Sequence, residues 1–312
     1  MAFLIAEGRV LAFLWGAVWA SFGNVVIHRL PRGQSLVSPP SHCPRCNARI
    51  RWYDNVPILG WLWLRGRCRD CRNRISVRYP LVELLGGVLS LLLFEHYVAG
   101  GPVDVPLLAR LAPFLVYFAF SFALLIVTFI DIDLQLVPTV ITLPGTALGL
   151  LMSLILVRIT FLESVAGIVC GAGVLYVINA GYRAVRGRSG FGDGDLALLA
   201  MIGAFCGVQS LIFVLLAASL QGTLAAAVFG LVRRIFGVTI GLKSADGIDD
   251  EVLEDEEWTP MDAAGEDTSV GQAALAFVPF LSLAAVEWLL VGPQLLDSYF
   301  SFVGSMAAPG GG

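Results

Sequence analysis

Long apolar segments separated by polar stretches recur along most of this 312-residue chain. A helix that crosses the hydrocarbon core of a bilayer needs about 20 mostly apolar residues, and eight segments are close to that length. They cover residues 9–28, 81–99, 107–130, 136–157, 161–182, 195–208, 209–232 and 273–292. The pattern predicts an all-α polytopic membrane protein with about eight transmembrane helices.

Two long polar segments divide the apolar runs into regions. We expect a first transmembrane helix over 1–28, a small cytoplasmic module over 29–80, transmembrane helices two to seven over 81–232, an acidic insertion over 233–272, and a last transmembrane helix with its tail over 273–312. The insertion carries eleven acidic residues between Asp246 and Asp267 and no basic one. Such a composition is typical of a solvated, disordered segment.

The composition supports a membrane protein. Hydrophobic residues make up 57% of the chain and charged residues 14%, whereas soluble domains carry about a quarter charged residues. These values exclude a soluble globular enzyme, a disordered chain and a disulfide-rich secreted scaffold.

The arginines orient the predicted helices. Eleven arginines and two aspartates lie between Arg29 and Arg78, which gives this segment a net charge of +9. If eight spans alternate, 17 of the 20 Lys and Arg residues fall on the same side as this segment, and Arg9, Arg110 and Arg158 fall on the other. By the positive-inside rule, the arginine-rich side faces the cytoplasm.

Four of the six cysteines form two CxxC pairs, Cys43 with Cys46 and Cys68 with Cys71, separated by 21 residues. This spacing is typical of a four-thiolate, structural zinc site, in which each pair supplies two ligands from a tight turn. The alternative is two disulfides, which a cytoplasmic location disfavours. We therefore expect zinc, bound by a module too small to fold on its own core.

Carboxylates beside apolar segments are costly and point to function. Asp131 and Asp133 end the third apolar segment, and Gly192-Asp193-Gly194-Asp195 precedes the sixth. Alternating topology brings both clusters to one side of the membrane. Two carboxylates that share a proton can activate water and polarise a carbonyl, as in aspartic proteases, and the glycines allow close approach of another backbone.

Two other interpretations of these aspartates stay open. They can be solvated interfacial charges, or a helix N-cap in the case of Asp195. A small transporter could use them to carry protons or cations, although such a protein is expected to place polar residues deep in several spans.

The order of these motifs resembles the prepilin peptidases, GxGD aspartic proteases that process type IV pilins and type II secretion pseudopilins. The resemblance runs from Ser21 to about Leu290 without the acidic insertion. The segments that carry it are Ser21-Phe22-Gly23-Asn24, the two CxxC pairs, Trp52-Tyr53-Asp54-Asn55-Val56-Pro57, Arg78-Tyr79-Pro80-Leu81-Val82-Glu83, Asp131 with Leu136-Val137-Pro138 and Leu143-Pro144, and Gly192-Asp193-Gly194-Asp195 with Leu198-Leu199-Ala200.

The resemblance implies that Asp131 and Asp195 are catalytic, with Asp133, Asp193, Gly192 and Gly194 in supporting positions. Asp133 lies about 200° around a helix from Asp131, so the two side chains cannot face one water molecule.

The resemblance also implies a second activity. Long family members cleave the leader after its glycine and then methylate the new N-terminal residue with S-adenosylmethionine. The methyl transfer is associated with residues 29–80, where Gly66-Arg67 stands in place of a common Gly-Lys pair. Gly66, Arg67 and Glu83 are the candidate donor-binding residues, although Glu83 is expected first of all to pair with an arginine of the module.

These implications place the chain as a multi-pass protein of the bacterial inner membrane, with the zinc module and the active site facing the cytoplasm. The expected partners are prepilin or pseudopilin substrates and membrane lipid, with no nucleic acid. A peptidase that lacks methyltransferase activity is the main alternative.

Overall fold

The computed structural model describes residues 2–101, 104–156, 158–186, 192–236 and 276–307. Within these ranges the regular secondary structure is helical, and besides the helices there are only two isolated β-bridges. Its helices are α1 (Ala2–Arg29), η1 (Leu30–Arg32), η2 (Trp52–Asp54), α2 (Leu59–Trp63), α3 (Arg78–Phe94), η3 (Glu95–Ala99), α4 (Leu107–Leu134), α5 (Thr139–Met152), α6 (Phe161–Arg186), α7 (Asp193–Cys206), α8 (Val208–Phe236) and α9 (Val278–Ala307). The all-α prediction is therefore confirmed for the described residues.

Six of these helices are long and apolar enough to cross a membrane, which supports a multi-pass membrane protein. The six are Ile5–Arg32, Arg78–Ala99, Leu107–Leu134, Phe161–Arg186, Val208–Val232 and Val278–Leu296. The other two apolar segments form α5 and α7, each of 14 residues. A helix of that length rises only about 21 Å, less than the ~30 Å hydrocarbon core. Eight full spans are therefore not confirmed.

One helix extends past the predicted start of the acidic insertion. Helix α8 continues to Phe236, so the start of the predicted acidic insertion is helical. The acidic residues themselves, Asp246 to Asp267, lie outside the described residues. Gly207, with φ of +79°, separates α7 from α8, at the point where the two apolar runs merge in the sequence.

Small residues allow helices to pack backbone against backbone. A Cβ atom on Gly16 of α1 would lie 2.2 Å from the carbonyl oxygen of Gly86 in α3. The same holds for α6 and α7, where a Cβ on Gly167 would lie 2.2 Å from the carbonyl oxygen of Gly203. Such contacts are typical of membrane helices, which associate mainly by close packing.

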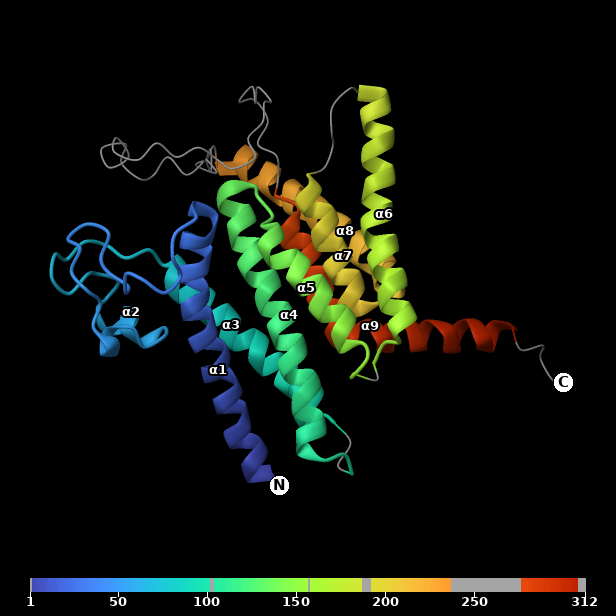
Figure 1. The fold of residues 1–312 in the computed structure, drawn as a ribbon, viewed down its shortest axis with the longest axis horizontal. Coiled ribbons are helices and arrows are strands. Elements are labelled where there is room, and N and C mark those ends of the chain that lie inside the picture. Colours follow the sequence, from blue (N-terminus) through green and yellow to red (C-terminus); the bar gives the residue numbers. More distant parts are fainter. Residues whose placement is uncertain (1, 102–103, 157, 187–191, 237–275, 308–312) are drawn as a thin grey trace.

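Helix α4 joins these two pairs of helices. It contacts α1 and α3 on one side and α5 and α9 on the other, and the ring of its Phe120 stacks on Phe205 of α7 with centroids 4.4 Å apart. The C-terminal end of α4 and the N-terminal end of α7 lie together at the upper end of the bundle, and the cysteine-containing module lies beside α1 near that end (Figure 1).

Candidate functional site

Asp131 occupies the last turn of α4, with only 6% of its surface exposed. Its carboxylate faces the backbone N–H of Val278 at the start of α9 and interacts electrostatically with the carboxylate of Asp195. Its Oδ2 atom has no hydrogen-bond partner among the described residues. A buried carboxylate oxygen that is unpaired within the protein is available to a water molecule or a substrate.

Asp195 lies in the first turn of α7. Its Oδ2 atom accepts a hydrogen bond of 3.2 Å from the N–H of Gly192, the N-cap residue of this helix. The interpretation of Asp195 as part of a helix cap is thus partly right, but the carboxylate also faces Asp131. The structure therefore brings together the two aspartates that the resemblance singles out.

The second glycine of the GxGD segment, Gly194, is required for steric reasons. A Cβ atom on Gly194 would lie 2.7 Å from the Cβ of Val137 and 2.8 Å from its carbonyl oxygen. Only glycine lets the start of α7 approach the α4–α5 connection this closely. At Gly194 the backbone that approaches closely is therefore that of the protein itself. At Gly192 there is more room, because the atom nearest to an added Cβ would be 3.9 Å away, on Asp195. Asp193 begins α7, and its side chain lies outside the described part.

Asp133 has a different partner from Asp131. Its Oδ1 accepts a hydrogen bond of 2.6 Å from the guanidinium of Arg78, the first residue of α3. The same guanidinium donates to the carbonyl oxygen of Phe129 at 3.3 Å. Arg78 therefore fastens α3 to the last turns of α4, and the sequence pattern does not reveal this pairing.

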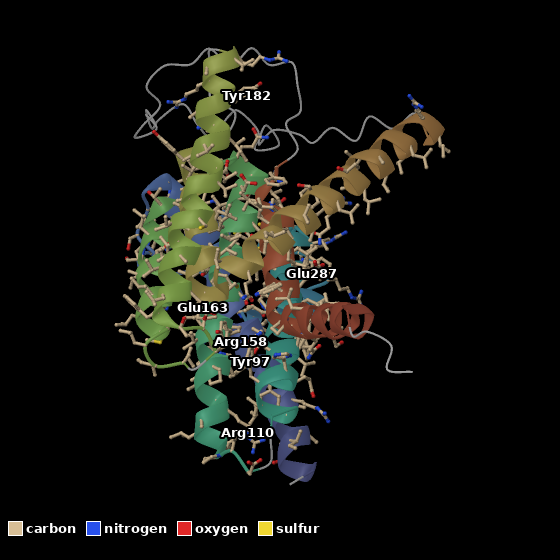
Figure 2. All side chains as sticks on the ribbon, turned by 90° about the vertical axis from the view of Figure 1, so that its right-hand side faces the viewer. Tyr97, Arg110, Arg158, Glu163, Tyr182 and Glu287 are labelled. Carbon is tan, nitrogen blue, oxygen red and sulfur yellow. The ribbon has the colours of Figure 1, made fainter. Side chains whose placement is uncertain are left out.

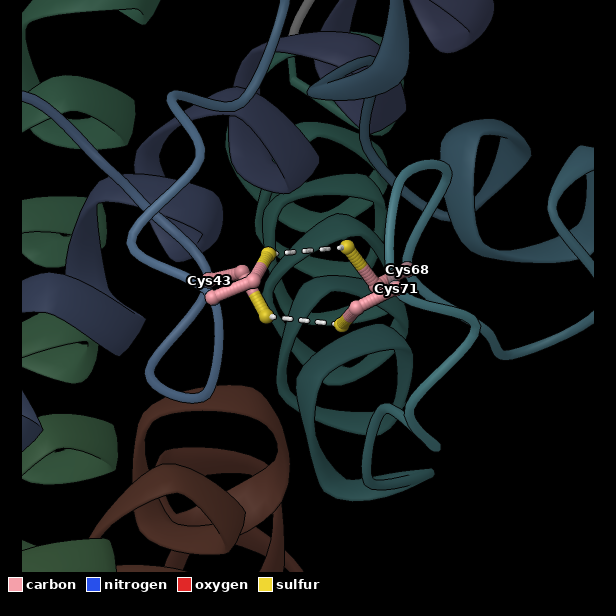
Figure 3. Close-up of side chains that lie close together, drawn as sticks. Cys43, Cys68 and Cys71 are labelled. Carbon is pink, nitrogen blue, oxygen red and sulfur yellow. Dashed lines mark hydrogen bonds between the residues drawn. The ribbon is translucent and has the colours of Figure 1, made fainter.

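The four cysteines of the CxxC pairs converge (Figure 3). Their sulfur atoms all lie within 4.8 Å of one another, with 3.8 Å between Cys43 and Cys71 and 4.0 Å between Cys46 and Cys68. Four thiolates around a tetrahedral zinc, with Zn–S bonds of about 2.3 Å, would have sulfurs about 3.8 Å apart. All four cysteines are free, so the disulfide alternative is wrong.

The two CxxC pairs have the same backbone geometry. The N–H of Cys43 donates to Ala48 and that of Cys68 to Asn73, at 3.0 and 2.8 Å. In each pair the residue four positions after the first cysteine, Asn47 or Arg72, has a positive φ. Each loop is thus a tight knuckle that presents two sulfurs to the same point, as a metal site requires.

The pKa values of the cysteine thiols are also consistent with a site that binds a cation. Burial raises the pKa of Cys43, but the backbone N–H groups of Cys46 and Arg45 outweigh this effect and lower it to about 7. At Cys46 the N–H of Ala48 favours the thiolate, yet burial and the neighbouring thiols raise its pKa to about 12. Four thiolates cannot coexist here without a cation to offset their mutual repulsion.

Two family models match the chain, the Bacterial Peptidase A24 N-terminal domain over residues 14–97 and the Type IV leader peptidase family over residues 118–227. A prepilin leader peptidase/N-methyltransferase of Aeromonas salmonicida is 37% identical over 246 residues, which are 71% of this chain and 79% of the relative. The protein of that name from Myxococcus xanthus is 34% identical over 330 residues, 92% of this chain and 91% of the relative. The chain belongs to the type IV leader peptidase family.

Membership of the leader peptidase family confirms the resemblance and shows that the protein is an enzyme, a protease with an associated methyltransferase activity. A third relative with the same name, from Klebsiella pneumoniae, is 41% identical over 213 residues, 66% of this chain and 89% of the relative. No solved structure matches the chain at comparable significance. The first family model covers the four cysteines, and the second covers both aspartates.

The three candidate donor-binding residues of this leader peptidase have separate structural settings. Gly66 adopts φ of +65°, and a Cβ there would lie 2.7 Å from the ring of Trp61. Arg67 pairs with Arg74 in the bridge that closes the second knuckle. Gly66 and the backbone of Arg67 thus shape the module.

Glu83 does not pair with an arginine, so that prediction is wrong for the described residues. Its Oε2 accepts a hydrogen bond of 2.7 Å from the N–H of Ile58, and its carboxylate also interacts with the hydroxyl of Ser21. Ile58 has φ of +63°, which is unfavourable for a β-branched residue. Glu83 therefore holds a strained turn of the module against α1 and α3.

An ion pair between Asp54 and Arg69 stabilises the module. Arg69 Nε donates to Asp54 Oδ2 at 2.7 Å, and this bond lowers the pKa of Asp54. The guanidinium also lies 5.4 Å from the ring centroid of Tyr53. The pair joins residues on either side of α2, and no spacing rule points to it.

Proposed function

We propose that this protein cleaves the leader peptide of type IV prepilins and type II secretion pseudopilins at the cytoplasmic face of the membrane. The observation that carries the proposal is the pair Asp131 and Asp195, two carboxylates that interact at adjoining ends of α4 and α7. The names of the relatives, prepilin leader peptidase/N-methyltransferase, support the substrate class.

Hydrolysis by such a pair needs one proton shared between two carboxylates. The ionised aspartate takes a proton from water while the neutral one donates its proton to the oxygen of the scissile carbonyl. The hydroxide oxygen bonds to the carbonyl carbon and gives a gem-diol intermediate. Its C–N bond then breaks as the first aspartate gives its proton to the departing amine and the second aspartate takes a proton from one hydroxyl of the gem-diol. Each carboxylate then returns to its starting state. The unpaired Oδ2 of Asp131 supplies an acceptor for the water.

We propose that the protein resides in the bacterial inner membrane with Asp131, Asp195 and the module at the cytoplasmic side. The net charge of +9 between Arg29 and Arg78 supports this orientation. The helical start of the substrate would lie among the membrane helices, with the scissile bond at the aspartates.

The metal of the module is proposed to be zinc, with a structural role. Four sulfur ligands match the preference of Zn²⁺ and leave no coordination position open for water. The described module has a few short helical turns and two isolated bridges, so metal binding would contribute much of its folding free energy.

We propose further that the module, together with neighbouring helices, methylates the new N-terminus, and S-adenosylmethionine supplies the methyl group. A cavity of about 640 Å³ beside the first knuckle fits such a donor in size. Its lining includes Trp52 and Tyr53, whose rings can stack on a base, and Arg49 and Arg51, whose charges suit a carboxylate. Glu83 would act indirectly by holding the Ile58 turn.

One co-expression experiment tests the proposal. A model prepilin is expressed with the wild-type protein or with Asp131→Asn, Asp195→Asn or Asp133→Asn, and intact masses of the pilin are measured. Wild type is expected to yield pilin without leader and with one added methyl group. Either catalytic variant should leave the leader in place at normal expression level, whereas Asp133→Asn retains cleavage because its carboxylate pairs with Arg78. Normal processing by Asp131→Asn or Asp195→Asn would refute the assignment.

A further inference from the structure

A second cavity, of about 410 Å³, lies at the end of α7 opposite to Asp195, and its lining combines apolar with charged and polar side chains. It forms where chain junctions meet: the start of η3, the α5–α6 connection, the α7–α8 junction at Gly207, and α9 around Pro293. Its polar lining side chains are His96, Arg158, Glu163, Gln209 and Gln294. Figure 2 shows Arg158, Glu163 and Tyr97 close together in the lower part of the molecule.

Arg158 carries a charge that no carboxylate of the described residues neutralises. Its guanidinium donates to the hydroxyl of Tyr97 and, at 2.9 Å, to the carbonyl oxygen of Leu289. The guanidinium carbon lies 5.2 Å from the ring centroid of Tyr97 and 5.3 Å from that of Tyr117. These contacts fix its position, but each acceptor is neutral, and no carboxylate of the described residues lies within 4.0 Å of it.

Glu163 supplies the opposite charge and is likewise held by neutral groups. Its Oε2 accepts hydrogen bonds from the N–H and the hydroxyl of Thr160, at 2.7 and 3.0 Å, in a capping box at the start of α6. Arg158 and Glu163 thus line one cavity without forming an ion pair in the described structure. An arrangement that keeps two opposite charges apart suits a ligand that carries both charges itself.

Exposed leucine and isoleucine side chains flank this cavity along the chain. Leu154, Ile155 and Leu162 are 64%, 66% and 77% exposed on the α5–α6 connection and the start of α6, and Leu295 of α9 is 51% exposed. In a multi-pass membrane protein such side chains contact lipid acyl chains. A cavity that holds two opposite charges next to an apolar surface matches the amphipathic structure of a phospholipid.

We propose that this cavity binds a zwitterionic phospholipid whose headgroup has a phosphodiester and a primary ammonium group. Arg158 binds the phosphate, Glu163 accepts hydrogen bonds from the ammonium, and the acyl chains follow the exposed leucines. A purely anionic headgroup leaves Glu163 unmatched, and a quaternary ammonium has no N–H to donate. Bound lipid would fasten α3, α6, α8 and α9 together at this end of the bundle, because a ligand of the native state stabilises it.

Native mass spectrometry of the delipidated full chain in detergent tests this proposal. Phosphatidylethanolamine, phosphatidylcholine, phosphatidylglycerol and soluble phosphoethanolamine are each titrated. We expect phosphatidylethanolamine to bind at least about tenfold more tightly than the other three, and Arg158→Gln to weaken it by about tenfold, the loss of one charge-assisted hydrogen bond. Glu163→Gln should abolish the preference over phosphatidylglycerol.

Two variants serve as controls. Arg9→Gln removes an exposed arginine at the same end of the bundle that is paired with Glu95, and it should bind lipid as wild type does. Arg158→Lys keeps the positive charge and serves as the second variant if Arg158→Gln fails to fold. It should retain part of the affinity for the lipid. Equal binding of all lipids, unchanged binding by Arg158→Gln, or soluble phosphoethanolamine binding as tightly as the lipid would each overturn the proposal.

Discussion

At the residue scale, the two proposed catalytic carboxylates differ in what holds them. Asp195 is fixed by the N–H of its own N-cap residue, Gly192. Asp131 is fixed by its burial at the end of α4 and by the start of α9. The distance between them therefore depends on how closely α7 approaches the α4–α5 connection, and Gly194 sets that approach.

We predict that Gly194→Ala impairs cleavage while the protein still folds. The added methyl group would lie 2.7 Å from the Cβ of Val137, and the overpacking should cost about 1–3 kcal/mol. Displacement of Asp195 by about 1 Å should lower the rate of leader cleavage by about 100-fold. The rate is measured with purified enzyme and a prepilin peptide.

Gly173→Ala in α6 is the matched control, because a Cβ there meets no atom within 4 Å. It should cleave at the wild-type rate. If Gly194→Ala cleaves equally well, the close contact with Val137 does not position the aspartate.

Some residues of the site could be predicted from the sequence and others could not. Asp131, Asp195 and the four cysteines belong to short motifs, and alternation of the spans is enough to put both aspartates at one end. The pairs Asp133–Arg78, Asp54–Arg69 and Glu83–Ile58 join residues 55, 15 and 25 positions apart. No periodicity links such positions, so only the folded chain shows them.

At the scale of elements, the two knuckles are the only parts of the described module with matching hydrogen-bond patterns. Each knuckle offers two sulfurs, and neither can complete a tetrahedral site alone. The metal would therefore join two knuckles that are 21 residues apart in the sequence. The residues between them form η2 and α2, which have little hydrophobic core of their own.

We predict that the Cys43→Ser/Cys46→Ser variant loses zinc and its module unfolds. Wild-type protein should contain about one zinc per chain, measured by elemental analysis, because four thiolates form one structural site. Without the metal, the arginine-rich module should become readily cleaved by trypsin, since zinc binding supplies its folding energy. Cys170→Ser, which alters an exposed cysteine of α6, should keep both the metal and the resistance. A metal-free wild-type protein would contradict the prediction.

The sequence predicts the positions of the helices better than their lengths. All eight apolar segments contain a helix, but hydropathy cannot show where a helix ends inside an apolar run. Helix α5 stops at Met152, although Leu154, Ile155 and Leu156 continue the apolar pattern. Its neighbour α7 ends at Cys206, because the positive φ of Gly207 breaks the helix between two apolar stretches.

At the scale of the whole molecule, the first turns of α1 and the last turns of α9 both lie away from the aspartates (Figure 1). With the arginine-rich module in the cytoplasm, both ends are expected on the opposite side of the membrane. An alkaline phosphatase fused after Ala307 should therefore be active in cells, and the same reporter fused within the module after Arg65 should be inactive. The reverse pattern would contradict the proposed orientation.

The close backbone contacts divide the bundle into two packs, with α1 against α3 and α6 against α7. Asp195 belongs to the second pack, and Asp131 is carried by α4, which joins the two packs. A nascent chain that has inserted only α1 to α4 therefore holds one of the two proposed catalytic carboxylates and not the pair. Proteolytic activity would arise only when α7 packs against α4. The order of insertion would therefore keep an incompletely folded protease from cleaving neighbouring membrane proteins.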